Sequence, residues 1–345
     1  MDELRVRDVG EFGLIQRLRA VLPAEVQTTP GLEIGIGDDA AVWQPPAGER
    51  LVVTTDSLIA DVHFRLDWTD WASLGHKMLA VNVSDLAAMG AEPKLAVIAL
   101  GLQGHERVDD LESLYRGLGA LARRYGLVIA GGDIVRSPRG LVLHVTALGN
   151  SRRGRVLTRS AANVGDVIGV TGTLGASAAG LRLLSLNQGD PRRGAATADL
   201  LIEAHLTPEP RVREGALLLD HGATSAMDLS DGLLGDLPKI LSASHVSARL
   251  GEREIPIAAA VKALFPDDWL ELALRGGEDY ELLFTAAPGD WHAIKQAIRD
   301  AGTTAAIIGE IVRSYPDGPR IEIMGLDGRT RVESPGAFDH FNAPE

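Results

Sequence analysis

The spacing of apolar residues in the first half of the chain predicts alternating strands and helices. Over 71–91 the apolar residues recur at intervals of three and four, at Leu74, Met78, Leu79, Val83 and Leu86. This period places them on one side of a helix, and 108–125 has the same amphipathic pattern. Short apolar runs predict strands over 51–56, 95–102, 126–133 and 141–148. The third run is expected to enter a glycine turn at Gly131 and Gly132.

The second half repeats this alternation after a polar, glycine-flanked segment, 149–154, which is typical of a linker. Strands are predicted over 166–171, 224–229, 281–285 and 304–308. Helices are predicted over 175–186, 211–220, 231–244 and 291–301, and a flexible loop over 187–197. At roughly 150 residues per domain, a chain of 345 residues suggests two domains. We therefore expect an α/β fold with mixed α+β sheets, divided into domains over 1–150 and 151–345.

Composition and charge narrow the possible functions. The net charge of −13 disfavours binding to the phosphate backbone of nucleic acids. The absence of cysteine excludes thiolate catalysis, disulfides and Cys-ligated metal sites. The N-terminus lacks the apolar segment of a signal peptide, and no apolar run approaches the ~20 residues that a membrane span needs. We therefore expect a cytoplasmic protein that binds neither nucleic acid nor membrane.

Acidic residues gather at the ends of apolar segments, beside Gly, Ser or Thr. The positions are Asp38, Asp39, Asp56, Asp85, Asp133, Asp228, Asp231, Glu278 and Asp279. Each alone has an ordinary explanation, because Asp is a good helix N-cap and turn residue. Together they would repel one another if their segments converge, since two carboxylates about 4 Å apart cost about 4 kcal/mol at an effective dielectric of ~20. Divalent cations would offset this cost, and oxygen ligands without Cys or a histidine cluster favour Mg²⁺ over zinc.

Because Mg²⁺ usually accompanies phosphate, a nucleotide-binding motif is expected. A Walker A loop is absent, because no Lys of the chain follows a Gly. The segment 35–40 (GIGDDA) imitates the dinucleotide fingerprint, but its two acids stand where a bare pyrophosphate would lie. The segment 171–177 (TGTLGAS) is either a routine strand-to-helix turn or a source of backbone amides for phosphate. A serine nucleophile elbow is also absent, since Ser177 lacks the second glycine of that motif.

Several short segments, taken in order, resemble the thiamine-monophosphate kinase family of the aminoimidazole-ribonucleotide-synthetase-like superfamily. The most specific are KMLAVNVSDLAAMGA (77–91), MDLSDGL (227–233), GGEDYEL (276–282) and FDHF (338–341). The others are GIGDDAA (35–41), TTDS (54–57), HF (63–64), GGD (131–133), LTRS (157–160) and TGTLG (171–175). Each match is weak alone, whereas the ordered set extends from residue 35 to residue 341.

This resemblance implies an N-terminal domain that binds ATP and Mg²⁺ and pairs its sheet with a second subunit, so a homodimer is expected. It also implies a C-terminal domain that completes the nucleotide and substrate sites. The implied reaction is the ATP-dependent phosphorylation of thiamine monophosphate to thiamine diphosphate, with several Mg²⁺ ions. Because a phosphate acceptor has a second pKa of about 6, it is largely a dianion at neutral pH and needs no general base. We therefore expect direct in-line transfer without a catalytic acid–base residue.

The resemblance also assigns site residues by position. The metal residues are Asp38, Asp39, Thr54, Thr55, Asp56, Asp85, Asp133, Asp228 and Asp231. The ATP contacts are Tyr115, Gly131, Gly132, Arg159 and Ser230, and the thiamine-phosphate contacts are His63, Glu278 and Phe338. Phe338 could instead pack the C-terminus, and Arg159 could be a solvated linker residue.

Two related families are disfavoured by composition. Selenophosphate synthetases and hydrogenase-maturation dehydratases share the superfamily but rely on Cys or selenocysteine, and this chain has no Cys. An aminoimidazole ribonucleotide synthetase-like enzyme and a non-catalytic metal–nucleotide-binding protein are the remaining alternatives.

Overall fold

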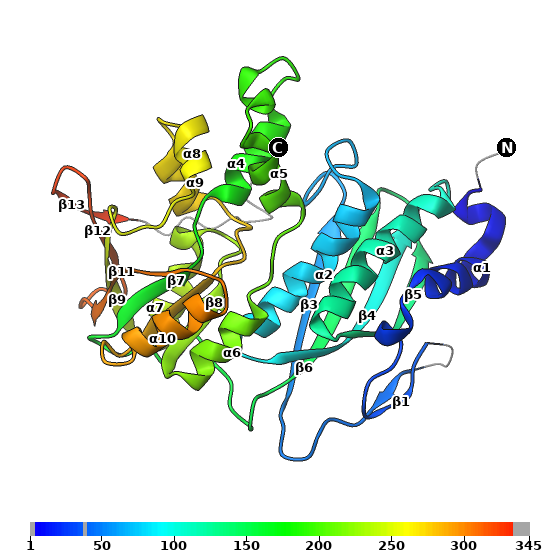
Figure 1. The fold of residues 1–345 in the computed structure, drawn as a ribbon, viewed down its shortest axis with the longest axis horizontal. Coiled ribbons are helices and arrows are strands. Elements are labelled where there is room, and N and C mark those ends of the chain that lie inside the picture. Colours follow the sequence, from blue (N-terminus) through cyan, green and yellow to red (C-terminus); the bar gives the residue numbers. More distant parts are fainter. Residues whose placement is uncertain (1–3, 37–39, 334–345) are drawn as a thin grey trace. The chain divides into compact units, whose positions relative to one another are not determined.

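A computed structural model describes residues 4–36 and 40–333, and the chain divides into two compact units (Figure 1). Unit 1 comprises residues 1–86 and 91–155, and unit 2 comprises residues 87–90 and 156–345. Three predicted site residues, Asp38, Asp39 and Phe338, lie outside the described residues.

Unit 1 is built on a four-stranded sheet in the order β3-β6-β4-β5. Its strands are β3 (Leu51–Ile59), β4 (Glu92–Leu102), β5 (Val128–Arg136) and β6 (Val142–Asn150). Only β4 and β5 are parallel among these pairs, and the crossover between them is a helix, α3 (Val108–Tyr125). With α2 (Trp71–Ala88), α3 covers one face of the sheet (Figure 1). The other described elements of unit 1 are α1 (Val6–Val21), the 3-10 helix η1 (Ala24–Val26), β1 (Leu32–Ile34) and β2 (Val42–Trp43).

Close backbone contact fixes α2 against α3. A Cβ on Gly75 would lie 1.9 Å from the carbonyl oxygen of Leu114, and one on Gly117 would lie 1.9 Å from that of Ala72. Only glycine therefore permits this approach at both positions. The predicted apolar stripe of α2 is confirmed, because its five members are each exposed by 1 % or less. This packing determines where α2 presents Asp85, in its last turns.

Unit 2 contains a seven-stranded mixed sheet in the order β13-β12-β9-β11-β7-β10-β8. Its strands are β7 (Val167–Thr171), β8 (Ala223–Asp228), β9 (Val246–Gly251), β10 (Leu282–Ala286), β11 (Ala305–Arg313), β12 (Ile321–Met324) and β13 (Thr330–Glu333). Its helices are α4 (Ala176–Ser185), η2 (Pro191–Gly194), α5 (Ala198–Leu206), α6 (Val212–Asp220), α7 (Leu233–Ser244), α8 (Ala259–Leu264), α9 (Trp269–Arg275) and α10 (Trp291–Asp300). Apolar side chains from β7, β8 and α7 join one buried core, which includes Val170, Met227 and Leu237.

The structure corrects two local predictions in unit 1. Asp56 does not end a strand: β3 continues to Ile59, and Asp56 pairs with Val145 in its interior. The next residues, Ser57 to Ile59, sustain the ladder because their alternating side chains suit a half-buried strand. Gly131 and Gly132 do not form a turn either, since β5 runs through them with a register shift. A Cβ on Gly132 would lie 2.0 Å from the carbonyl oxygen of Ile98, so this glycine permits close strand contact.

Other elements were not predicted from the sequence. The expected loop over 187–197 contains η2, which Asp190 caps through the amide of Arg192. The helices α1, α5, α8 and α9 and the strands β1, β2, β9, β12 and β13 were also missed. No helix within 4–36 and 40–333 is long and apolar enough to cross a membrane.

Candidate functional site

The acids of unit 1 meet where α2 faces β3. The Thr54 hydroxyl on β3 donates a hydrogen bond of 2.5 Å to Oδ2 of Asp85 on α2. Burial, the charge of Asp85 and a hydrogen bond with Asp85 raise the pKa of Asp56 to about 6. Two residues assigned from separate sequence segments therefore share one partly buried place, as the crowding argument predicts.

These residues fit part of a magnesium site. Two carboxylates and a hydroxyl are the hard oxygen ligands that Mg²⁺ prefers. Within the described part of the chain, however, no group of three or more His, Cys, Asp or Glu is placed to hold a metal ion. Asp133 lies in register with Ala99 and His144, whereas Asp56 lies in register with Val145. Paired residues share a face and successive residues alternate, so Asp133 is on the sheet face opposite Asp56.

A cavity of about 940 Å³ in unit 1 gathers several predicted nucleotide contacts. Tyr115, Gly131 and Gly132 line it, together with Asp133, which was predicted as a metal residue. Residues on both sides of the undescribed segment 37–39 line it as well, namely Gly35, Ile36, Ala40 and Ala41. Tyr115 is 8 % exposed, and burial raises its pKa, so it stays a neutral hydrogen-bonding group. The structure thus brings together residues that are far apart in the sequence.

Two other predicted residues of unit 1, His63 and Thr55, form hydrogen bonds at or beside β3. The ring Nδ1 of His63 accepts a hydrogen bond of 3.1 Å from the amide of Ile59, at the end of β3. Nε2 therefore carries the proton in the neutral ring. The hydroxyl of Thr55 lies 3.0 Å from Nε2 of His144 and also bonds the carbonyl oxygen of Val145. Thr55 thus points to the face that carries His144 and not to Asp85.

In unit 2 two motifs 49 positions apart pair along their backbones, 227–233 with 276–282. The amide of Leu229 donates to the carbonyl oxygen of Glu281, and the amide of Tyr280 donates to that of Leu229. The amide of Glu278 donates to the carbonyl oxygen of Ser230 at 2.8 Å. The backbone pairing therefore places the predicted residues Asp228, Ser230 and Asp231 beside Glu278.

Asp231 has a cationic partner in the chain. Nζ of Lys239 lies 2.6 Å from Asp231 and 2.7 Å from Asp236, and Asp236 also accepts from the Asp231 amide. Although burial opposes it, these two carboxylates raise the pKa of Lys239. A metal ion at Asp231 would therefore compete with this ammonium group. Asp228 is 4 % exposed at the end of β8 and remains better suited to a buried ligand position.

Arg159 is placed by its backbone. Its carbonyl oxygen accepts a hydrogen bond of 2.8 Å from the Ser244 hydroxyl, and the residue itself is exposed. An exposed arginine at this place suits a nucleotide contact as well as a solvated position.

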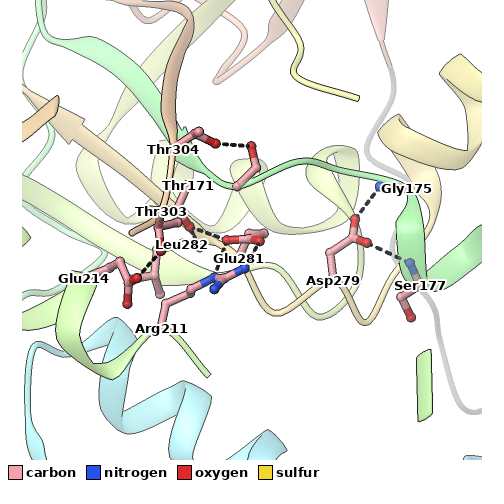
Figure 2. Close-up of polar contacts among 11 residues, drawn as sticks. Thr171, Gly175, Ser177, Arg211, Glu214, Asp279, Glu281, Leu282, Thr303 and Thr304 are labelled. Carbon is pink, nitrogen blue, oxygen red and sulfur yellow. Dashed lines mark hydrogen bonds and ion pairs between the residues drawn. The ribbon is translucent and has the colours of Figure 1, made fainter. Parts of the chain in front are cut away.

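The two acids that follow Glu278 are held by the protein itself (Figure 2). Asp279 accepts hydrogen bonds from the amides of Gly175 and Ser177 at 2.7 and 3.1 Å, at the N-terminus of α4. Burial raises the pKa of Asp279 to about 7, against the lowering effect of these amides. Two of the amides that the sequence offered for phosphate are therefore occupied, and the turn 171–177 is a carboxylate-capped strand-to-helix turn.

Glu281 forms a buried ion pair with Arg211. The guanidinium donates from Nε and Nη2 to the two carboxylate oxygens, at 2.7 and 2.5 Å. The Thr171 hydroxyl adds a third bond of 2.6 Å, and Figure 2 shows the three side chains converging. Although burial opposes it, the pairing raises the pKa of Arg211. This bidentate geometry makes Glu281 a structural anchor for β10.

Sequence reasoning missed His205, Ser177, Arg211 and Lys239. Each contacts an acid of the motifs or an acid beside one. The distances for Ser177, Arg211 and Lys239 are given above, and Nδ1 of His205 lies 3.3 Å from Oε2 of Glu278. A single signal was available in the sequence: Lys239 follows Asp236 by three positions on a predicted helix. The others lie 70 to 102 positions from the acids they contact, where no local pattern marks them.

Known proteins resemble this chain over nearly its whole length. The family model "AIR synthase related protein, N-terminal domain" matches residues 37–150, and the corresponding C-terminal domain model matches residues 163–318. The thiamine-monophosphate kinase of Escherichia coli (strain K12) is 40 % identical over 344 residues, covering 97 % of this chain and 99 % of that protein. The chain belongs to the thiamine-monophosphate kinase family.

Solved structures of this family have the same fold. The thiamine-monophosphate kinase of Stenotrophomonas maltophilia K279a is 39 % identical, with a TM-score of 0.78 over 92 % of this chain and 96 % of that one. A structure described as "AaThiL complexed with AMPPCP and TMP" is 29 % identical, with a TM-score of 0.71 over 95 % and 97 %. The resemblance inferred from the sequence and the expected mixed α/β fold are thereby confirmed. The pairing of the sheet with a second subunit stays a prediction, as do the individual site residues.

Proposed function

We propose that this chain transfers the terminal phosphoryl group of ATP to thiamine monophosphate, giving ADP and thiamine diphosphate. The observation that carries the proposal is the match over nearly the whole chain to a family in which AaThiL is solved with AMPPCP and TMP. The cavity of unit 1 supports it, because that cavity collects Tyr115, Gly131, Gly132 and Asp133. The paired motifs of unit 2 add Ser230 and Glu278, so both units contain residues of the proposed sites.

We assign Mg²⁺ binding to Thr54, Asp56 and Asp85 in unit 1 and to Asp228 in unit 2, with Asp38, Asp39 and Asp231 as further members. Thr55 and Asp133 are on the opposite face of the sheet, so we assign them to a separate cation. When bound, Mg²⁺ would neutralise the charge of the two phosphate-bearing substrates. The cluster of unit 1 is suited to a cation because burial sets two carboxylates against each other. We assign His63, Glu278 and Phe338 to thiamine monophosphate, whose aminopyrimidine can donate to the Glu278 carboxylate.

The transfer needs no protein base, because the acceptor phosphate is largely a dianion at neutral pH. The work of the side chains is to bind and align two anionic substrates, and we propose direct in-line transfer. Trapping a stable aspartyl phosphate from ATP alone would contradict this mechanism.

The assay that tests the function uses the purified chain with ATP, Mg²⁺ and thiamine monophosphate, and detects thiamine diphosphate by chromatography. Parallel samples contain free thiamine or no Mg²⁺. We expect product from the monophosphate alone and only with the metal. Absence of product from folded protein that binds ATP would overturn the proposal and point to another superfamily substrate or to a non-catalytic binding role.

We further propose that the open face of the sheet of unit 1 pairs with a second copy of the chain. Val53 on β3 and Val135 on β5 are 55 and 52 % exposed, although both are apolar. Sedimentation of the purified protein tests this: we expect a dimer, and a Val53→Lys variant that sediments as a monomer. A wild-type monomer at assay concentrations would contradict the assignment.

A further inference from the structure

A buried histidine contacts the carboxylate that we assign to the substrate. His205 lies on α5 and is 5 % exposed. Its Nδ1 is 3.3 Å from Oε2 of Glu278 and 3.0 Å from Oγ of Ser177. The Glu278 side chain is 26 % exposed, so it contacts the buried histidine and also reaches the surface.

The chemistry of these groups fixes the direction of the hydrogen bond. An ionised carboxylate only accepts, so Nδ1 of His205 must carry a proton to bond it. That N–H is then shared between the oxygens of Glu278 and Ser177, since both lie within reach. The backbone of Glu278 is fixed as well: its φ of 64° is in the left-handed region, and its amide bonds Ser230. Glu278 is therefore ordered before a ligand binds, so binding costs less side-chain entropy.

The second contact of His205 is itself anchored. Ser177 is in the first turn of α4, and its amide donates to Asp279. Asp279 follows Glu278 directly and also accepts from the amide of Gly175 (Figure 2). Ser177 is 1 % exposed. Ser177 on α4 therefore contacts both parts of the site. Its hydroxyl lies beside His205, and its amide holds Asp279, the residue that follows Glu278.

We propose that His205 is a positioning residue that holds the Glu278 carboxylate in the orientation that accepts the aminopyrimidine of thiamine monophosphate. This inference rests on the proposed function. His205 acts through Glu278 and affects recognition of the thiamine moiety, not of ATP. A role confined to the core of unit 2 would instead lower stability and leave the ratio of substrate affinities unchanged.

The test compares His205→Leu with His205→Asn, whose amide nitrogen can take the place of Nδ1. We expect His205→Leu to raise KM for thiamine monophosphate about 10- to 20-fold, the low end of the effect of one hydrogen bond to a charged group, because the histidine acts through Glu278. KM for ATP and kcat should change less than twofold, and His205→Asn should recover most of the loss. Ile202→Val, on the same helix and packed against its core, is the matched control. Calorimetric titration with thiamine monophosphate in the absence of ATP gives a second readout.

A double-mutant cycle with Glu278→Gln decides whether the histidine acts through the glutamate. We expect His205→Leu to add little once Glu278 is already changed. Additive losses, an unchanged KM for thiamine monophosphate in His205→Leu, or equal changes in both KM values would overturn the inference. Should His205→Leu fail to fold, Ser177→Ala and His205→Asn decide it: a selective rise in the same KM for Ser177→Ala supports the inference, and no rise overturns it. Wild-type protein that forms no thiamine diphosphate would overturn the proposed function itself, so the two failures are distinguishable.

Discussion

Two groups of buried acids in this chain have opposite kinds of neighbour. In unit 1, Asp56 is set against Asp85, and burial, charge and hydrogen bonding all raise its pKa. In unit 2, Glu281 has a bidentate guanidinium and Asp279 has two helix amides. The difference separates two roles for a buried carboxylate. An acid with a partner from the chain anchors the fold, whereas an acid that faces another acid is suited to bind a cation from solution.

The largest effect is expected at the anchor of unit 2. Arg211→Met leaves Glu281 buried without its counter-charge, and removing one partner of a buried pair costs about 3–5 kcal/mol. Urea denaturation followed by circular dichroism measures the loss in the free energy of unfolding. Arg213→Met is the control, because Arg213 is an exposed neighbour on α6 whose guanidinium donates at 3.4 Å to a carbonyl oxygen. A loss for Arg211→Met no larger than that for Arg213→Met would show that Glu281 needs no partner.

Removing a carboxylate from the cluster of unit 1 should lower activity and leave stability nearly unchanged. Asp85→Asn is expected to lower the rate of thiamine diphosphate formation by about 10²–10³-fold, or about 3–4 kcal/mol, because a cation ligand is lost. Its unfolding midpoint should stay close to that of the wild type, since the change removes a repulsive charge. Asp70→Asn, in the same unit but at the start of α2, should retain most of the activity. Near-normal turnover in Asp85→Asn would remove Asp85 from the metal set.

The cap at α4 predicts a pH dependence of stability. The pKa of Asp279 is raised to about 7 by burial, against an ordinary value of about 3.9 in an unfolded chain. Between these values the folded state holds a proton that the unfolded state lacks. The contribution of Asp279 to stability is therefore full below about pH 4 and is lost as the pH rises through 7. Asp279→Asn should remove this slope, which is at most about 1.4 kcal/mol per pH unit.

Asp70 supplies the control of opposite sign. Partial burial acts to raise its pKa, but hydrogen bonds from the hydroxyl and amide of Ser73 lower the pKa overall. Its contribution is present above the unfolded value and is lost as the pH falls through the folded one. Denaturation from pH 3 to pH 8 should therefore show Asp70→Asn differing from the wild type most above pH 4. Parallel pH profiles for wild type and Asp279→Asn would contradict the assignment at Asp279.

The smallest effect is expected from relieving the repulsion in unit 1. Asp56→Asn should stabilise the metal-free protein by about 0.5–1 kcal/mol, the scale of two nearby charges with partial solvation. Added Mg²⁺ should raise the unfolding temperature of the wild type and not that of this variant. A destabilised Asp56→Asn in the presence of a chelator would show that the pair is a stabilising contact in its own right.

Helices and strands whose apolar residues recur with a clear period could be predicted from the sequence alone. The helix over 108–125 agrees with α3 at both ends, and the predicted strand 141–148 lies largely within β6. The ordered motifs were sufficient to identify the family, because each motif is a run of adjacent residues that can be read without knowing its neighbours in space. The same motifs could nominate acids, but they could not divide them into anchors and ligands.

Which of these acids have partners from the chain depends on contacts between distant segments. Thr171 and Glu281 are 110 positions apart, and Thr54 and Asp85 are 31 apart, so no local pattern reveals either contact. Asp56 looked like a strand end because an acid follows an apolar run, yet its ladder with β6 continues to Ile59. The turn 171–177 was predicted to be open to phosphate, but the fold brings Asp279 to its amides. Periodicity shows which residues are buried, whereas the charge state and role of a buried carboxylate depend on the donors that folding brings within about 3 Å of it.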